Sequence, residues 1–367
     1  MRITAVTAVP FVLPYRRPFH MASGTVLEAA HVLIRIETDE GPMGVAEAVS
    51  RSMIYGESQA SIVEAVRSWF APALAGLDPF EVESAQKVLR SVVANDTTKG
   101  AIDIALHDLR GKAVGESTWR LLGAASTSLR VTHMLGTGSV ADVVAEAAAA
   151  RQDSGIDAFK VKVDTRMSSS LALLAALRRE LGDDALLYID ANQSLSAEET
   201  VASLGRLAEL GVHLVEEPVP STDLVGKARI AAAGGVAIMA DESATTLETA
   251  AVQLTTGSAR ALSIKPARTG YTTSSRILGL ARGLHARAII GSQGDSAIGT
   301  ITSATFGAAF EWTAREPAEL DYFLGLGDQI VTSAPVIRAG RVHVDPTVAG
   351  NGVEIDEDKL AHFRVDS

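Results

Sequence analysis

The sequence contains no cysteine, and this absence excludes disulfide bonds and thiolate chemistry. It suits a reducing compartment, so we expect a cytoplasmic protein. No run of about 18 or more apolar residues occurs, so no transmembrane helix is expected. The N-terminal stretch MRITAVTAVPFVLPYRRPF is interrupted by threonine and proline, and it is more typical of a β-strand than of a signal peptide.

Positive charge is scarce as well. The net charge is −11 and no basic cluster occurs, which argues against nucleic acid or an anionic membrane as a partner. An anionic small molecule is still compatible, because a bound divalent cation and lysines can reverse the charge locally. Hydrophobic residues make up 47% of the chain and charged residues 21%, as in soluble globular enzymes.

Five short apolar runs each end in charged residues, separated by 24 to 28 residues from Lys162 to Lys265. That interval is the length of one strand plus one helix, so it predicts a (β/α) barrel. One acidic residue after a strand is often only a helix cap, but five runs in the order Lys, acid, acid, acid, Lys are hard to explain by capping. The runs are AFKVKV with Lys160 and Lys162, LLYIDAN with Asp190, HLVEEP with Glu216 and Glu217, AIMADES with Asp241 and Glu242, and ALSIKP with Lys265.

The chain of 367 residues exceeds a bare barrel of about 250 residues, so a further domain is expected. Residues 1–125 are predicted to form an α+β domain, with an antiparallel sheet before about residue 50 and helices over about 57–75 and 97–113. The barrel is predicted over 126–320, with a helix over 299–315 and a short last strand over 317–320. Residues 321–367 are predicted to return to the N-terminal domain. The other barrel strands are expected at 130–135, 158–163, 185–191, 212–217, 236–241, 261–265 and 287–292.

Three carboxylates are predicted to meet at one rim of the barrel, because parallel strands all end on the same side. Asp190, Glu216 and Asp241 offer hard oxygen ligands suited to Mg²⁺ or Mn²⁺. Glu216 and Glu217 are adjacent and point to opposite sides of the strand, so only one is expected to bind metal. Asn192 and Glu242 are candidates to orient these carboxylates.

Lysines stand on either side of the acidic strands. A carboxylate substrate held by the cation would present its α-carbon between Lys162 and Lys265, which could act as acid and base. A lysine can act as the base only if its pKa falls toward neutrality. The positive charges of the cation and of the neighbouring Lys160 would both lower the pKa of Lys162. For Lys160 itself, a solvated strand end is an equally good interpretation.

The motifs KVK, DAN, EEP, DES and SIKPARTG, in this order and spacing, resemble the enolase superfamily in its muconate lactonizing enzyme subgroup. The resemblance implies a (β/α)7β modified TIM barrel with an N-terminal α+β capping domain completed by the C-terminal segment, and a Mg²⁺ site. It also implies Asp190, Glu216 and Asp241 as metal ligands, Lys162 and Lys265 as the acid/base pair, and Lys160 as a support. Strand seven ends in GSQGDS without histidine, which argues against the mandelate racemase subgroup.

Specificity in this family comes from two capping loops, which correspond to about residues 20–25 and 51–55. The resemblance therefore predicts a set of residues that contact the substrate, although a turn built on Gly294 is the alternative role for two of them, Gln293 and Asp295. His133 is a further candidate for contact with substrate. The set is His20, Arg51, Tyr55, Gln293, Asp295 and Glu319.

HMLG, SIKPARTGYTTS and AELDYFL are similar to muconate cycloisomerases of actinobacterial type, which interconvert cis,cis-muconate and muconolactone. This likeness implies an isomerase acting on a small carboxylate, assembled as a homo-oligomer, either a dimer or an octamer. A racemase or epimerase of N-acylamino acids or dipeptides with the same two lysines is the alternative. A catalytically silent scaffold is the third hypothesis, disfavoured because a buried acidic cluster without a cation costs stability.

Overall fold

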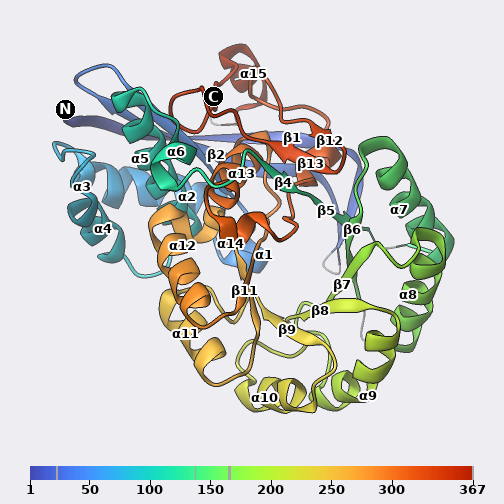
Figure 1. The fold of residues 1–367 in the computed structure, drawn as a ribbon. Coiled ribbons are helices and arrows are strands. Elements are labelled where there is room, and N and C mark those ends of the chain that lie inside the picture. Colours follow the sequence, from blue (N-terminus) through green and yellow to red (C-terminus); the bar gives the residue numbers. More distant parts are fainter. Residues whose placement is uncertain (22–23, 137, 164–166, 366–367) are drawn as a thin grey trace.

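In a computed structural model, seven parallel strands form one curved sheet in which neighbours along the chain are neighbours in space (Figure 1). The structure describes residues 1–21, 24–136, 138–163 and 167–365. Each strand lies within one of the ranges predicted from the apolar runs of the sequence. The strands are β5 (Thr132–Leu135), β6 (Ala158–Lys162), β7 (Leu186–Asp190), β8 (Val212–Glu216), β9 (Ala237–Ala240), β10 (Ala261–Ile264) and β11 (Arg287–Ile290).

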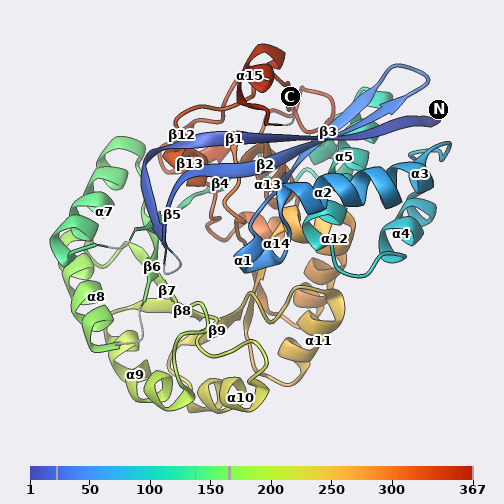
Figure 2. The ribbon, with the colours of Figure 1, turned by 180° about the vertical axis from the view of Figure 1, so that it is seen from behind.

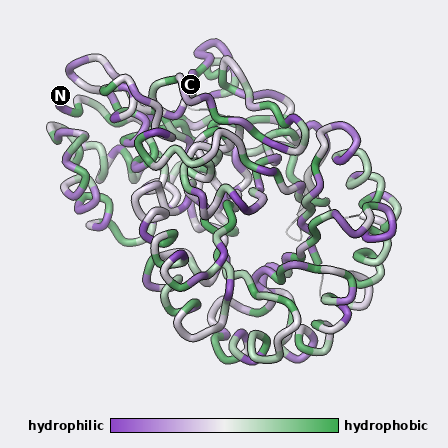
Figure 3. Tube along the Cα trace, viewed as in Figure 1, coloured by the Kyte–Doolittle hydropathy of each residue, from purple (hydrophilic) through white to green (hydrophobic). Residues whose placement is uncertain are grey.

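Helices between the strands surround the sheet (Figure 1). Green and purple alternate along them in Figure 3, as expected for helices with one face on the sheet. The barrel interior holds a cluster of apolar side chains at alternate strand positions, including Ala158, Tyr188 and Leu214. The helices are α7 (Val140–Ser154), α8 (Met167–Leu181), α9 (Ala197–Glu209), α10 (Leu224–Ala233), α11 (Leu247–Thr255) and α12 (Pro266–Gly283).

Residues 317–320 close the barrel. The backbone of Ala318 exchanges hydrogen bonds with Arg130 and Thr132 beside β5, at 2.8 and 2.7 Å, and Glu319 N–H donates to Ile290 of β11 at 2.9 Å. The predicted last strand is therefore reduced to a bridge, yet it joins both edges of the sheet. The predicted helix over 299–315 is two helices, α13 (Ala297–Ala309) and α14 (Glu311–Ala314), because Phe310 between them is extended. The (β/α)7β fold class is confirmed.

An antiparallel sheet of β1 (Ile3–Met21), β2 (Gly24–Thr38) and β3 (Met43–Val49) lies above the barrel in the view of Figure 1. The first hairpin is longer than predicted, because pairing continues to Met21 and Gly24 after a register shift beyond Pro14. Helix α4 was not among the predicted helices. The helices of this region are α1 (Ser52–Tyr55), α2 (Gln59–Ala65), the π-helix η1 (Val66–Phe70), α3 (Ala71–Leu74), α4 (Val82–Arg90), α5 (Asp96–Val114) and α6 (Thr118–Leu122).

The C-terminal segment lies against the N-terminal sheet, and both chain ends are on the same side of the molecule (Figures 1 and 2). After the 3-10 turn η2 (Tyr322–Gly325), β12 (Ile337–Arg338) pairs with β13 (Arg341–His343), and β13 pairs with β4 (Ser128–Arg130). The helix α15 (Glu357–Phe363) follows, and Arg364 forms a bridge to Phe11 of β1. Across the described ranges, no helix is long and apolar enough to cross a membrane.

Candidate active site

The charged strand ends gather at one rim of the barrel. Lys162, Asp190 and Glu216 are partners in register at the last positions of β6, β7 and β8. Asp241 and Lys265 directly follow β9 and β10. The carboxyl ends of parallel strands share an edge, so the spacing of the sequence becomes a cluster of opposite charges in space.

Lys160 lies inside the barrel with only 3% of its surface exposed, so its interpretation as a solvated strand end is wrong. Its Nζ is 3.0 Å from Asp190 Oδ2, 2.7 Å from Glu216 Oε2 and 2.8 Å from Glu319 Oε1. Burial lowers the pKa of Lys160, but these carboxylates outweigh it and raise the pKa well above its ordinary value. Lys160 is therefore a fixed positive charge among the acids.

Glu216 is fully buried, and apart from the ion pair of its Oε2 with Lys160, neither of its carboxylate oxygens accepts a hydrogen bond from the described residues. Burial, with Asp190 nearby, raises the pKa of Glu216 well above its ordinary value. A buried carboxylate without hydrogen bonds is costly unless a cation is close. Lys160 supplies part of that charge, and the free lone pairs of Glu216 fit a second cation.

Lys162 reaches Asp190 from the rim, and its side chain is 37% exposed. Its Nζ lies 2.6 Å from Asp190 Oδ2 and donates to Asn192 Oδ1. Asn192 in turn donates its backbone N–H to Asp190 Oδ1 at 2.9 Å and its side-chain amide to Glu242 Oε1 at 3.1 Å. The two residues expected to orient carboxylates therefore lie beside them.

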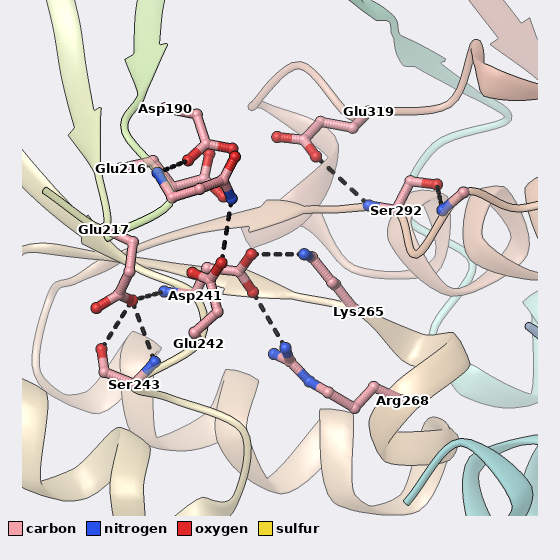
Figure 4. A network of polar contacts seen from close by, with 12 residues as sticks. Asp190, Glu216, Glu217, Asp241, Glu242, Ser243, Lys265, Arg268, Ser292 and Glu319 are labelled. Carbon is pink, nitrogen blue, oxygen red and sulfur yellow. Dashed lines mark hydrogen bonds and ion pairs between the residues drawn. The ribbon is translucent and has the colours of Figure 1, made fainter. Parts of the chain in front are cut away.

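Lys265 approaches from the far side and contacts Asp241, which also accepts from Arg268 Nη1 at 3.1 Å (Figure 4). Burial lowers the pKa of Lys265, but the Asp241 carboxylate outweighs it, so this pKa lies above its ordinary value. Burial alone would raise the pKa of Asp241, and Lys265 and Arg268 reverse that shift. Arg268 was missed from the sequence, although its place three residues after Lys265 puts it on the first turn of α12.

Among the described residues, no three acidic or histidine side chains are already gathered as a metal-binding cluster. Lysine ammonium groups contact these acids instead: Lys160 contacts Asp190 and Glu216, Lys162 contacts Asp190, and Lys265 contacts Asp241. The three carboxylates at the ends of adjacent strands, with Glu216 Oε1 unpartnered among the described residues, fit Mg²⁺ or Mn²⁺ if the Lys162 and Lys265 contacts give way. Glu217 is turned away toward Ser243 (Figure 4).

Two of the residues predicted to contact substrate lie on or beside α1. Tyr55 stands close enough to Lys265 and Asp241 for their charges to act on its phenol, whose pKa burial raises. Arg51 donates to Tyr322 Oη, and its guanidinium carbon is 5.1 Å from the centre of that ring. The side chain of His20 and the tip of the first predicted capping loop lie outside the described residues.

Glu319 reaches the centre of the barrel from the closing segment. Its Oε1 accepts from Tyr188 Oη at 2.7 Å in addition to Lys160, and its Oε2 accepts the Ser292 N–H at 3.5 Å. Tyr188 and Ser292 were not predicted as site residues. Tyr188 is paired in register with Lys160 on the neighbouring strand, so the two side chains lie on the same face of the sheet. That pairing could have identified Tyr188 as a residue of the interior.

Gln293 and Asp295 are buried in a tight turn after β11. Ser292 Oγ accepts the N–H groups of Gly294 and Asp295 at 2.9 and 3.2 Å, which supports the turn interpretation. Each side chain nevertheless keeps an oxygen without a partner in the described region, Gln293 Oε1 and Asp295 Oδ1. Burial raises the pKa of Asp295 to about 6.

His133 does not fit the expectation of contact with substrate. Its Nδ1 contacts Asp321, and its Nε2 lies 3.1 Å from Glu146 Oε1 of α7. Met134 is paired with Lys160, whose side chain faces the barrel interior. His133 is the residue before Met134, and successive side chains of a strand point to opposite faces, so His133 points toward the surrounding helices. His133 therefore joins the sheet to its outer layer.

Two family descriptions match the chain, "Mandelate racemase / muconate lactonizing enzyme, N-terminal domain" over residues 3–123 and "Enolase C-terminal domain-like" over residues 142–359. A solved muconate lactonizing enzyme from Mycobacterium smegmatis in complex with muconolactone is 42% identical, with a TM-score of 0.96 and complete coverage of both chains. A chloromuconate cycloisomerase from Pseudomonas sp. strain P51 is 31% identical over 99% of each chain.

Similarity extends to enzymes with another activity. A dipeptide epimerase from Enterococcus faecalis, solved with Mg and the dipeptide L-Leu-L-Tyr, is 28% identical with a TM-score of 0.90, covering 96% of this chain and all of the other. The same fold and a similar sequence therefore occur in both cycloisomerases and epimerases.

Proposed function

The chain belongs to the enolase superfamily, in its mandelate racemase and muconate lactonizing enzyme family, and from this we propose that it is a Mg²⁺-dependent isomerase that converts cis,cis-muconate to muconolactone. The observation that carries the proposal is the placement of two lysines. Lys162 contacts Asp190 and Lys265 contacts Asp241, from strands that lie two positions to either side of β8. A small carboxylate held over Glu216 would have an ammonium group on each flank.

Asp190, Glu216 and Asp241 would hold the Mg²⁺, or Mn²⁺ in its place. The chemistry that the cation supplies when bound is stabilisation of negative charge on the substrate carboxylate. One of the two lysines donates a proton to the carbon next to that carboxylate, while the distal carboxylate oxygen forms the new C–O bond of the lactone. Tyr55, beside Lys265, would help to exclude water.

The anionic distal end of muconate is supported by Arg51. Its guanidinium stands against the backbone of Gly294, next to Gln293 and Asp295, and close to the turn after β11. A free oxygen on Asp295 would repel an anion, and Arg51 offsets that charge. Arg51 is the positive charge in this group, and on that charge we base the choice of a diacid over a substrate with a neutral distal end.

Spectroscopy tests the assignment directly. Purified protein with Mg²⁺ is expected to remove the ultraviolet absorbance of cis,cis-muconate, because lactone formation breaks the conjugated diene. Lys162→Met and Lys265→Met are each expected to lower the rate by about 10²-fold or more, with folding checked by circular dichroism. No decay above the rate without enzyme would refute the proposed substrate.

A racemase or epimerase is the second candidate, and lysines on opposite flanks are the observation that favours it. One lysine can remove an α-proton while the other returns a proton to the opposite face. An N-acylamino acid or dipeptide would then exchange its α-proton with deuterated solvent, observable by NMR. Exchange with these compounds and no reaction of muconate would establish this alternative.

A further inference from the structure

Glu217 is a fully buried carboxylate next to Glu216, and its side chain holds the loop that follows β9. Its Oε2 accepts the Asp241 N–H at 2.8 Å, the Ser243 N–H at 3.1 Å and the Ser243 hydroxyl at 2.9 Å. Figure 4 shows these contacts converging on Glu217. Three donors on one oxygen fix the backbone on both sides of Glu242.

The other oxygen, Oε1, accepts from Lys227 of α10, which is also fully buried. A buried carboxylate is tolerated when it is paired and its lone pairs are hydrogen-bonded. Lys227 supplies the compensating charge from behind the strand. Glu217 is therefore satisfied without any cation on the substrate side, in contrast to Glu216.

The backbone of Glu217 ties in the neighbouring strand as well. Its carbonyl accepts the Gln193 N–H at 2.8 Å in the loop after β7, and its N–H donates to Met239 of β9 at 3.0 Å. The φ angle of Glu217 is +35°, in a region that side chains other than glycine seldom adopt. This turn directs Glu216 into the barrel and Glu217 toward α10.

We infer that Glu217 is a positioning residue that holds the ends of β7, β8 and β9 together and so sets the distances between Asp190, Glu216 and Asp241. The inference rests on the proposed cation site, because it assigns Glu217 to the assembly of that site. Glu217 contacts no substrate in this role. It acts through the backbone of Asp241 and through its own peptide groups.

Glu217→Gln tests the role, with Mn²⁺ as the probe and its binding measured by electron paramagnetic resonance without substrate. An amide has only one acceptor oxygen, so it cannot satisfy both Lys227 and the three donors of the loop. The dissociation constant for Mn²⁺ is expected to rise about 10- to 100-fold, as for other residues that orient metal ligands.

Asp108→Asn is the matched control. Asp108 is also a fully buried carboxylate, bonded to Lys112 Nζ at 2.7 Å and to the N–H groups of Val45 and Asn351 at 2.9 and 2.6 Å, but it lies in the capping region on α5. This variant should lose thermal stability and keep the Mn²⁺ dissociation constant of the wild type. Equal weakening in both variants would overturn the inference, because general destabilisation would then explain the effect.

Ser243→Ala provides a milder variant if Glu217→Gln does not fold. It removes one of the three donors, and the Mn²⁺ dissociation constant is expected to rise by about 2- to 10-fold. Wild-type affinity in whichever variant folds would overturn the positioning role alone. Absence of Mn²⁺ and Mg²⁺ binding by the wild type would instead overturn the proposed cation site, and the inference with it.

Discussion

Lys160 Nζ lies 2.8 Å from Glu319 Oε1, and this pair joins β6 to the segment that closes the barrel. Both side chains are almost fully buried. Because Lys160 also contacts Asp190 and Glu216, one ammonium group partly neutralises three carboxylates from three elements. The charge balance of the site and the closure of the barrel therefore depend on the same contacts.

Replacing Lys160 with methionine should therefore destabilise the protein strongly. Loss of one partner of a buried ion pair leaves uncompensated charge and typically costs about 3 to 5 kcal/mol. The free energy of unfolding should fall by about that amount in urea titrations without divalent cations. Lys359→Met is the control, because both side chains of its pair with Asp328 are 41% exposed and an exposed ion pair contributes far less to stability than a buried one. Equal losses in the two variants would contradict the role of Lys160.

Divalent cations should stabilise the folded protein. The buried carboxylate of Glu216 is paired with Lys160 but accepts no other contact from the described residues, so a cation bound there compensates charge only in the folded state. At 100 times its dissociation constant, a cation that binds only the folded protein adds about 2.7 kcal/mol. Melting curves with EDTA and with Mg²⁺ should therefore differ for the wild type, while Glu216→Gln should show a much smaller difference. Identical wild-type curves would contradict a cation site at Glu216.

The stability of the protein should depend on His133 in the alkaline range. Burial lowers the pKa of His133, but Asp321 and Glu146 outweigh it and raise the pKa from 6.5 to about 10. A raised pKa means that the folded state binds the proton more tightly, so the stabilisation is complete below pH 6.5 and declines until the pH has passed about 10. The free energies of unfolding of the wild type and of His133→Gln should converge as the pH rises through this window, as measured by urea titrations at a series of pH values.

His107 offers the control for that experiment. It lies on α5, its Nε2 is 3.2 Å from Thr272 Oγ1, and burial lowers its pKa to about 4. Between pH 7 and 10.5 it is neutral in both states, so His107→Gln should show a constant difference from the wild type. A difference between wild type and His133→Gln that is equally flat would contradict the ion pairs assigned to His133.

Gly270 should tolerate no side chain. Its φ and ψ are 65° and 176°, which interrupts α12 shortly after Lys265, and a Cβ there would lie 2.6 Å from Asp103 Oδ2. Gly270→Ala should cost about 1 to 3 kcal/mol of stability and lower activity by displacing the turn that carries Lys265 and Arg268. Gly279→Ala is the control on the same helix, because no atom would approach its Cβ within 4 Å, and it should stabilise by about 0.5 to 1 kcal/mol. Equal stability of the two variants would contradict the strain at Gly270.

Much of the fold was predictable because each strand of the barrel is a separate apolar run with a helix after it. The errors have local causes. The break at Phe310 was missed because apolar residues continue across it. The full length of the β1–β2 hairpin was missed because a register shift after Pro14 interrupts the regular pairing. Residues 317–320 form a bridge in place of a strand, because the segment has only four residues and divides its backbone hydrogen bonds between the two edges of the sheet.

The roles of individual side chains were less predictable. Lys160 was equally plausible as a solvated residue, and only alternation along β6 combined with closure of the barrel places it inside. Three further residues of the site were not predicted, because none of them is a charged residue at the end of a strand: Arg268, Tyr188 and Ser292. Homo-oligomer formation, a cytoplasmic location and the domain boundaries at 125 and 320 stay predictions.

The sequence by itself determined which residues stand at the ends of the strands. Each strand is a short apolar run that ends in charged residues, and the runs recur at the length of one strand plus one helix. Alternation along a strand predicts that neighbours face opposite ways, but only the tertiary structure decided what each of two neighbouring side chains contacts. Glu216 and Glu217 are chemically identical in the sequence, and they differ because one backbone angle, the φ of +35° at Glu217, turns the second carboxylate toward Lys227. That angle is imposed by hydrogen bonds from adjacent strands, and no spacing along the chain records them.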